Sequence, residues 1–211
     1  GRMIGQALPV VDAEAPWVQN LIPGSDGKTF ESHYGVSGGA IRAKTAGKVT
    51  AITPEFIEIE AQDGTKQTIE TAVHMPYNRK TGLNQIAAVR IGDPVQPGDL
   101  LATSNYTDKS GTLALGRNAR VAYIPFEGRN YEDAWVISQS FADKMTSDHL
   151  YQHALEVEDG VQFGKNVHVS AFPGRYSKSM LDNFDTSGVI KPGTRVHQGD
   201  PLILAVKEKA H

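Results

Sequence analysis

Two adjacent carboxylates, Glu132 and Asp133, stand in a Gly-Arg-Asn-Tyr context and are attractive ligands for a divalent cation. Hard oxygen ligands suit magnesium. In a regular strand the two side chains would point to opposite faces, so both reach one ion only if they lie in a loop or a bulge. Spacing alone therefore favours a solvated acidic pair over a metal site.

Three arginines precede this acidic pair in the chain, namely Arg117, Arg120 and Arg129. A planar guanidinium with several donors suits bidentate contact with phosphate. The alternative is an ion pair that stabilises the fold, which is equally open for Arg117 and favoured for Arg120.

Composition excludes several classes of protein. The sequence of 211 residues contains no cysteine, which removes disulfides, thiolate zinc sites and cysteine nucleophiles. A formal net charge of -3 does not fit a strongly basic, stand-alone nucleic-acid binder. No phosphate-binding loop, serine-nucleophile elbow, signal peptide or membrane-span pattern is present, so we expect a soluble, intracellular protein.

The elements that must position these residues are mostly strands. Apolar and polar residues alternate in Phe56-Ile57-Glu58-Ile59-Glu60, and Asp63-Gly64 predicts a hairpin turn into Lys66–Ile69. Helix is scarce, and the best candidates are 134–145 and 178–184. Further strands are predicted at 119–124, 155–157, 167–169 and 202–206.

One internal repeat has the form Gly-x-x-Val-x-x-Gly-Asp-x-Leu and occurs at 92–101 and, in outline, at 193–202. Each copy predicts two glycine-containing turns around a buried valine, followed by a leucine that opens the next strand. Because such turns occur in many unrelated β modules, the repeat indicates structure rather than chemistry.

A long block from Leu113 to Ser138, containing Leu-Ala-Leu-Gly-Arg-Asn and Gly-Arg-Asn-Tyr-Glu-Asp, closely resembles the beta subunit of bacterial-type multisubunit RNA polymerase. Gln6-Ala7-Leu8-Pro9 and Glu14-Ala15-Pro16-Trp17-Val18 resemble earlier segments of the same family, in the same order. Segments around Ala46, Asn84 and Ser187 follow in register, so the resemblance covers nearly the whole chain.

The resemblance implies a mainly β fold with few short helices. It comprises part of a double-psi β-barrel, an adjoining barrel-sandwich-like β module and a flap base. We expect an N-terminal connecting segment at 1–30, a small β module at 31–75, half of the barrel at 76–155 and a flap-proximal β segment at 156–211. The match begins and ends inside the family's sequence, so we expect an internal fragment, with a phage-type source suggested by its divergence. An exposed edge of a half-barrel should make the isolated chain associate.

Within the family, a Glu-Asp pair equivalent to Glu132 and Asp133 lies near the second magnesium ion, acting through water. The primary ion is held by aspartates of the partner beta-prime subunit, in a motif that this sequence lacks. The resemblance also implies nucleotide or nucleic-acid contacts for Arg117, Asn118, Arg129, Asn78, Asn84 and Gln85. An arginine that the family uses on the nucleotide is Pro76 here, and Arg79 is the candidate substitute.

The function implied is template-directed RNA synthesis by an assembled nucleotidyltransferase, with no activity expected from the chain alone. The expected partners are the remaining beta segments, beta-prime and the other polymerase subunits, with DNA template, RNA and nucleoside triphosphates, and a transcription factor at the flap. No membrane partner is expected, and the location is the cytoplasm, or that of the bacterial host if the chain is phage-encoded.

Two other functions stay open. The chain could be a non-catalytic module that binds a factor through 157–207. The second alternative is a biotinyl or lipoyl carrier domain, because the turns of such carriers share the Gly-Asp-x-Leu pattern of this sequence. A carrier needs a lysine at an exposed hairpin tip, and Lys66 and Lys80 lack that setting.

Overall fold

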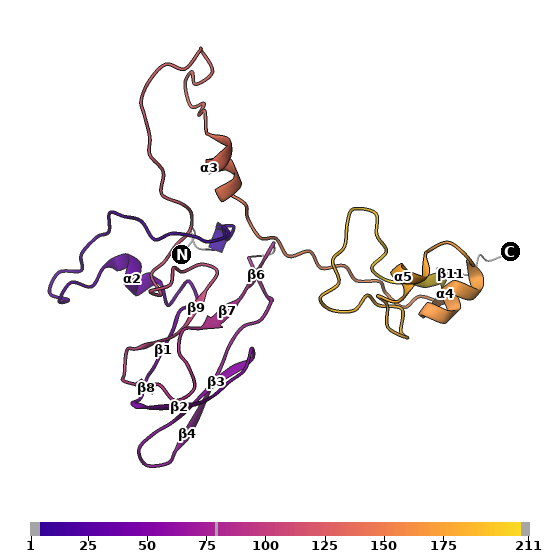
Figure 1. Ribbon diagram of the computed structural model, residues 1–211, viewed down its shortest axis with the longest axis horizontal. Helices are drawn as coiled ribbons and strands as arrows, with labels where there is room; N and C mark the ends of the chain where they lie inside the picture. Colours follow the sequence, from indigo (N-terminus) through magenta and orange to yellow (C-terminus); the bar gives the residue numbers. More distant parts are fainter. Residues whose placement is uncertain (1–4, 79, 208–211) are drawn as a thin grey trace. The chain divides into compact units, whose positions relative to one another are not determined.

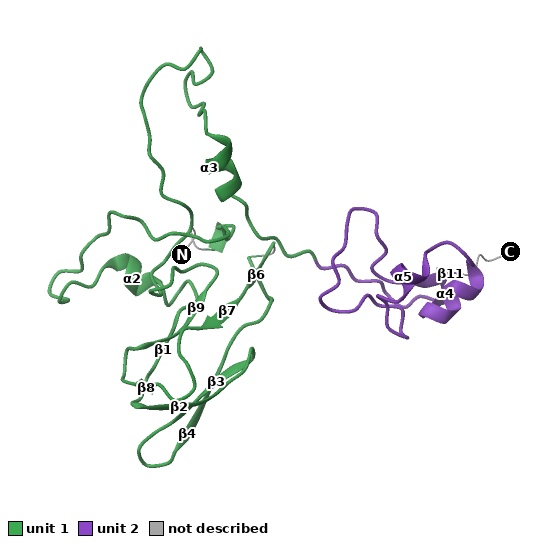
Figure 2. Ribbon diagram, in the orientation of Figure 1, with its two compact units in different colours: residues 1–151 green, residues 152–211 purple. Residues whose placement is uncertain are grey.

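The computed structural model describes residues 5–78 and 80–207, which divide into two compact units at 1–151 and 152–211 (Figure 2). Each unit has its own hydrogen-bonded strands. The division into four segments expected from the sequence stays a prediction.

The first unit is built around two small antiparallel sheets (Figure 1). One sheet has the strand order β4-β3-β2-β8 and the other β1-β9-β7, while β5 and β6 form a separate hairpin. The bounds are β1 (Ile41–Arg42), β2 (Gly47–Ile52), β3 (Phe56–Glu60), β4 (Lys66–Glu70), β5 (Met75–Tyr77), β6 (Thr81–Leu83), β7 (Gln85–Ala87), β8 (Pro94–Val95) and β9 (Leu100–Ser104).

The predicted hairpin is confirmed as β3 and β4, paired in register from Phe56 opposite Glu70 to Glu60 opposite Lys66. At its turn, Asp63 Oδ1 accepts a hydrogen bond from the Thr65 backbone N–H at 2.9 Å, and Gly64 has a φ of 81°. This is the left-handed conformation that glycine adopts without steric cost. The turn chemistry is local, which is why the sequence reveals it.

Apolar residues from both sheets share one core. Val49 of β2 and Ile57 and Ile59 of β3 are buried against Leu101 and Ala102 of β9. Alternation sends every second side chain of β3 to this face, so burial follows the period of the strand. A mainly β unit with a sandwich-like core results.

A buried polar network ties the β5–β6 hairpin to the turn after β9. The hydroxyls of Thr81 and Tyr106 lie 2.6 Å apart, and each residue is 1% exposed. Thr81 Oγ1 also donates toward Asn78 Oδ1, at 2.7 Å, and Asn78 Nδ2 donates to the Ala7 carbonyl. The network therefore also fastens the N-terminal segment.

Residues 119–145, which we call the arm, leave the sheets and form a long excursion that includes the helix α3 (Gln139–Lys144) (Figure 1). The N-terminal segment closes its base: Glu14 bridges to Gly116 on one side, and Val10 bridges to Ser147 on the other. The strand predicted at 119–124 is absent, and the helix predicted at 134–145 is only the six residues of α3, capped by Ser138. Within the described residues no strand lies beside 119–124 to supply hydrogen bonds, and an alternating pattern alone cannot form a ladder.

The second unit contains β10 (Val161–Phe163), α4 (Lys165–Ala171), α5 (Lys178–Leu181) and β11 (Ala205–Lys207), with β10 and β11 antiparallel. The strand predicted at 167–169 is wrong, because this segment is the middle of α4. His168 is buried there, and its ring packs on Phe172, four residues later at the C-cap of α4, and on Tyr176, which lies beyond the end of the helix. Residues 155–157 form no strand, 202–206 overlaps β11 only in part, and 178–184 is helical only over α5.

The two copies of the repeat form the same turn. Asp99 Oδ2 accepts from the Gln96 N–H at 2.7 Å, and Asp200 Oδ2 accepts from the His197 N–H at 2.8 Å. The valine is buried only in the first copy: Val95 belongs to the core, whereas Val196 is 43% exposed. The repeat thus determines the turn, while burial depends on what packs above it.

A mainly β fold with few short helices is confirmed. The sheets of the described residues do not close into a barrel, so the double-psi topology and the flap base stay predictions. In the part of the chain that the structure describes, no helix is long and apolar enough to cross a membrane. The short helix α2 (Phe30–Tyr34) completes the first unit, with a capping box formed by Thr29 and Ser32.

Candidate functional site

The acidic pair lies in an exposed turn of the arm. Glu132 has a φ of 59°, and neither Glu132 nor Asp133 belongs to a strand. The two side chains are therefore not forced to opposite faces, as they would be in a strand, and both carboxylates are exposed to solvent. Among the described residues, no group of three or more His, Cys, Asp or Glu side chains is placed to hold a metal ion. The pair fits a magnesium ion as a partial donor set, whose other ligands must come from water, substrate or another chain.

The turn is held by an asparagine that the sequence reasoning did not single out. Asn130 Nδ2 donates to the Ile124 carbonyl at 2.6 Å, and its Oδ1 accepts from the Phe126 N–H at 2.9 Å. These two bonds close a loop with Gly128 at a φ of 69°. The sequence does contain a signal for this turn: Asn130 follows Gly-Arg and stands shortly before the two carboxylates. Asparagine side chains commonly form hydrogen bonds with nearby backbone groups in turns.

A concavity of about 830 Å³ lies beside the acidic pair and is shared with Arg120 and aromatic side chains of the arm. Arg120 has no ion-pair partner among the described residues, so the ion pair favoured for it is not seen. Arg129 Nη2 lies 3.4 Å from Glu127 Oε2, with both side chains more than two-thirds exposed. An ion pair this exposed is weak, so both guanidinium groups remain available to an anion.

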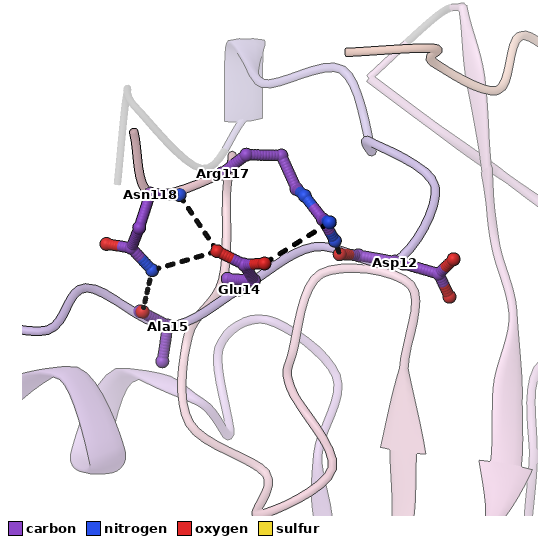
Figure 3. Close-up of polar contacts among 5 residues, drawn as sticks. All are labelled: Asp12, Glu14, Ala15, Arg117 and Asn118. Atoms are coloured by element: carbon purple, nitrogen blue, oxygen red, sulfur yellow. Dashed lines mark hydrogen bonds and ion pairs between the residues drawn. The ribbon is translucent and has the colours of Figure 1, made fainter. Parts of the chain in front are cut away.

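Arg117 and Asn118 instead bind the chain's own N-terminal segment (Figure 3). Arg117 Nη2 lies 3.2 Å from Glu14 Oε1, and Arg117 Nη1 donates to the Asp12 carbonyl. Asn118 donates to Glu14 Oε2 from its backbone N–H at 3.0 Å and from Nδ2 at 3.1 Å. Nδ2 also donates to the Ala15 carbonyl at 2.9 Å. One carboxylate thus receives three donors, and we call this group the Glu14 clamp.

The clamp has a consistent electrostatic signature. The pKa of Glu14 is lowered from its ordinary value, first by the backbone hydrogen bond from Asn118, then by the Asn118 side chain and the charge of Arg117. Arg117 keeps one buried donor, Nε, for which the described residues supply no acceptor. The ion-pair interpretation of Arg117 is confirmed, and its guanidinium faces Glu14 rather than open solvent.

The predicted polar strip also bonds to the chain itself. Asn84 Oδ1 accepts from the His74 N–H at 2.7 Å. Gln85 Oε1 accepts from the Ala72 N–H at 2.7 Å, and its Nε2 donates to the Gly39 carbonyl at 2.6 Å. Asn78 belongs to the buried network of Tyr106 and Thr81. These three side chains fix the connections around β5, β6 and β7.

The predicted site residues fall into separate places. Asn84, Arg117 and Asn118 line one concavity of about 1020 Å³ at the base of the arm, whereas Glu132 and Asp133 line the concavity farther along it. Asn78, Gln85 and Arg129 line neither of these. Arg79, the candidate substitute for the family's arginine, lies outside the described residues. Lys66, considered for a carrier, lies within β4 with its ammonium 3.0 Å from Glu58 Oε1.

Comparison with known proteins gives a consistent result. Residues 42–211 match the family described as RNA polymerase Rpb2, domain 6. The chain is 36% identical over 210 residues to the DNA-directed RNA polymerase subunit beta of Syntrophomonas wolfei, covering 99% of this chain and 18% of that protein. The same subunit of Corynebacterium diphtheriae is 33% identical and that of Streptococcus sanguinis 32% identical, each match covering 99% of this chain and 17% of the relative. The chain therefore spans less than a fifth of the length of these relatives, and it belongs to the beta-subunit family of DNA-directed RNA polymerases.

Proposed function

We propose that this chain acts as part of the beta subunit of a DNA-directed RNA polymerase, the nucleotidyltransferase that copies a DNA template into RNA. The observation that carries the proposal is a match to bacterial beta subunits along 99% of the chain at 32 to 36% identity. Because the chain corresponds to 17 to 18% of those proteins, RNA synthesis requires the remaining beta segments and beta-prime.

Within that assembly, Glu132 and Asp133 serve the nucleotide side of the reaction. Their exposed turn leaves both carboxylates able to hold a second magnesium ion through water, while beta-prime holds the primary ion. When bound, such an ion would neutralise charge on the triphosphate. The contribution of this chain is to position the two carboxylates, through the loop that Asn130 closes.

Contact with nucleic-acid or nucleotide phosphates falls chiefly to Arg129 and Arg120, whose guanidinium groups are weakly paired or free among the described residues. Arg117 and Asn118 support the same site indirectly, since the Glu14 clamp fixes the base of the arm. Asn78, Asn84 and Gln85 act in the same manner, by shaping the strip beside which a nucleotide or RNA end would lie.

The arm also supports assembly with further polypeptide. Its apolar side chains are strongly exposed: Tyr123 is 92%, Tyr131 78% and Trp135 70% exposed. Apolar surface of this kind normally lies against another protein surface. We therefore expect the isolated chain to associate with itself, and expect other polymerase segments to cover the arm.

The remaining parts of the proposal follow from the whole enzyme. DNA, RNA and nucleoside triphosphates are partners only in the assembly, and a transcription factor would bind the 156–211 segment. The site of action is the cytoplasm of a bacterial cell. A phage source stays a prediction, since the relatives named above are bacterial.

The test is reconstitution of the chain with the remaining beta segments and beta-prime, followed by RNA synthesis on a primed template. The variant Glu132→Ala with Asp133→Ala should assemble and elongate RNA poorly, with the defect partly relieved by raised magnesium and nucleotide. Glu156→Ala with Asp159→Ala removes the same charge from two exposed acidic residues that have no side-chain partner among the described residues, and it should leave elongation near wild type.

The outcomes separate the parts of the proposal. Full elongation by the Glu132 and Asp133 double variant would reduce that pair to a structural role. Failure of the wild-type chain to assemble at all would favour the non-catalytic, factor-binding alternative.

A further inference from the structure

The second unit contains a preformed pocket of about 260 Å³. Its lining includes Ser179 and Met180 of α5 and the loop around Arg195, which we call its walls, and Phe184 and Ile190, which we call its floor. Phe184 and Ile190 are apolar, with Phe184 only 2% exposed, and the charged and polar groups of the lining belong to the α5 segment and the Arg195 loop. A pocket of this size suits a single large side chain rather than a drug-sized ligand.

Hydrogen bonds fix both walls. On the α5 side, Ser177 Oγ accepts from the Met180 N–H at 3.2 Å. The loop is closed by the Asp200 carboxylate, which accepts from the His197 N–H at 2.8 Å, and Lys191 Nζ anchors its start on the Asp182 carbonyl at 2.7 Å. The floor is tied by the bridge between Phe184 and Ile190. Binding would therefore require little ordering of the protein.

Three polar side chains of the walls are free. Among the described residues, the Arg195 guanidinium, the Asn183 amide and the Thr194 hydroxyl have no hydrogen-bond or ion-pair partner. The one carboxylate in the lining, Asp200, is engaged with the His197 backbone and lies 3.5 Å from its Nδ1. The pocket thus offers one unpaired cation and two neutral hydrogen-bonding groups.

This combination selects the class of ligand. A guanidinium matches a carboxylate in bidentate geometry, and the amide and hydroxyl can bond a peptide backbone. A phosphate-rich ligand fits less well, because its multiple charge would face the Asp200 carboxylate with only one arginine in the lining. The apolar floor adds a place for a leucine-like or phenylalanine-like side chain.

We propose that this pocket binds a short acidic peptide segment of a partner protein, which places an apolar side chain on Phe184 and Ile190 and a carboxylate on Arg195. The pocket specifies the chemistry of the factor binding proposed above for 156–211 and rests on that part of the proposed function, but it does not depend on RNA synthesis by the assembly. Arginine with aromatic and aliphatic neighbours is the typical composition of the centre of a protein interface.

The test is an NMR titration of the isotope-labelled full chain with the peptide Ser-Leu-Phe-Asp-Ser, up to about 1 mM, in the range expected for one small contact. Amide signals of Ser179, Met180 and 194–196 should shift together. The counterpart Ser-Leu-Phe-Asn-Ser should bind about tenfold more weakly, because it loses a charge-assisted pair worth roughly 1.4 kcal/mol.

Matched variants keep the test decisive. Arg195→Gln should abolish the preference for the Asp peptide without altering the spectrum elsewhere. Arg175→Gln, which removes an exposed arginine outside the pocket, should retain it. Equal binding of the two peptides, no shift at these amides, or a stronger response to inorganic phosphate than to the Asp peptide would each overturn the proposal.

Discussion

The buried pair of hydroxyls on Thr81 and Tyr106 allows a quantitative test of how the β5–β6 hairpin is held. The perturbations are Tyr106→Phe, Thr81→Val and the two together. Both residues are 1% exposed and their oxygens lie 2.6 Å apart, so water does not replace a lost partner.

The three variants should differ in cost. In Tyr106→Phe, the Thr81 hydroxyl keeps Asn78 Oδ1 at 2.7 Å, so the loss is one net hydrogen bond, about 1 kcal/mol. In Thr81→Val, the Tyr106 hydroxyl keeps only long contacts of 3.4 Å with the Ala7 carbonyl and the Asn78 amide, and an unsatisfied buried group costs about 2 kcal/mol. The double variant removes both partners and should cost about 1 kcal/mol less than the sum of the two.

The assay is urea unfolding of the full chain at low concentration, with hydrogen exchange of the β5–β6 amides as a local readout. Tyr123→Phe is the matched control, since that ring is 92% exposed and its hydroxyl should contribute less than about 0.5 kcal/mol. Strict additivity of the two single variants would refute the reasoning, because it would mean that the two hydroxyls do not interact in the folded protein.

Three further expectations concern pH, a close backbone contact and the clamp. Burial is the main cause that raises the pKa of Tyr106 above 10.0, so the free energy of unfolding should fall as pH rises from 10.0 through the folded pKa. In alkaline unfolding experiments, Tyr106→Phe should lack this part of the pH dependence. Gly188→Ala places a Cβ 2.7 Å from the Leu204 carbonyl oxygen, whereas the Cβ of Gly174→Ala, at a similar φ, meets nothing within 4 Å. In thermal unfolding, Gly188→Ala should therefore be less stable than Gly174→Ala by about 1 to 3 kcal/mol. The pKa of Glu14 is lowered, so the stability that the clamp contributes is present above the ordinary pKa of 4.5 and is lost as pH falls through the folded pKa. Glu14→Gln should speed hydrogen exchange at the Asn118 backbone amide at neutral pH, and an unchanged rate would contradict the clamp.

Features with local causes were predictable from the chain. The hairpin of β3 and β4 follows from alternation and an Asp-Gly turn, and both repeat copies form their turn because an aspartate reaches a backbone N–H three residues earlier. The acidic pair Glu132 and Asp133 was singled out by residue type and context in the same way, and its role stays a prediction. In each case the interacting groups lie within a few residues of one another.

Tertiary structure decided what depends on distant partners. Arginine at 117 suits phosphate or carboxylate equally, and it binds Glu14 because folding brings the N-terminal segment to the base of the arm. The alternating segment at 119–124 stays unpaired because no strand lies beside it among the described residues. Residues 167–169 lie in α4, where His168 is buried against the ring of Tyr176, beyond the end of that helix. A sequence pattern states which contacts a residue can make, and only the assembled chain supplies the partner that selects among them.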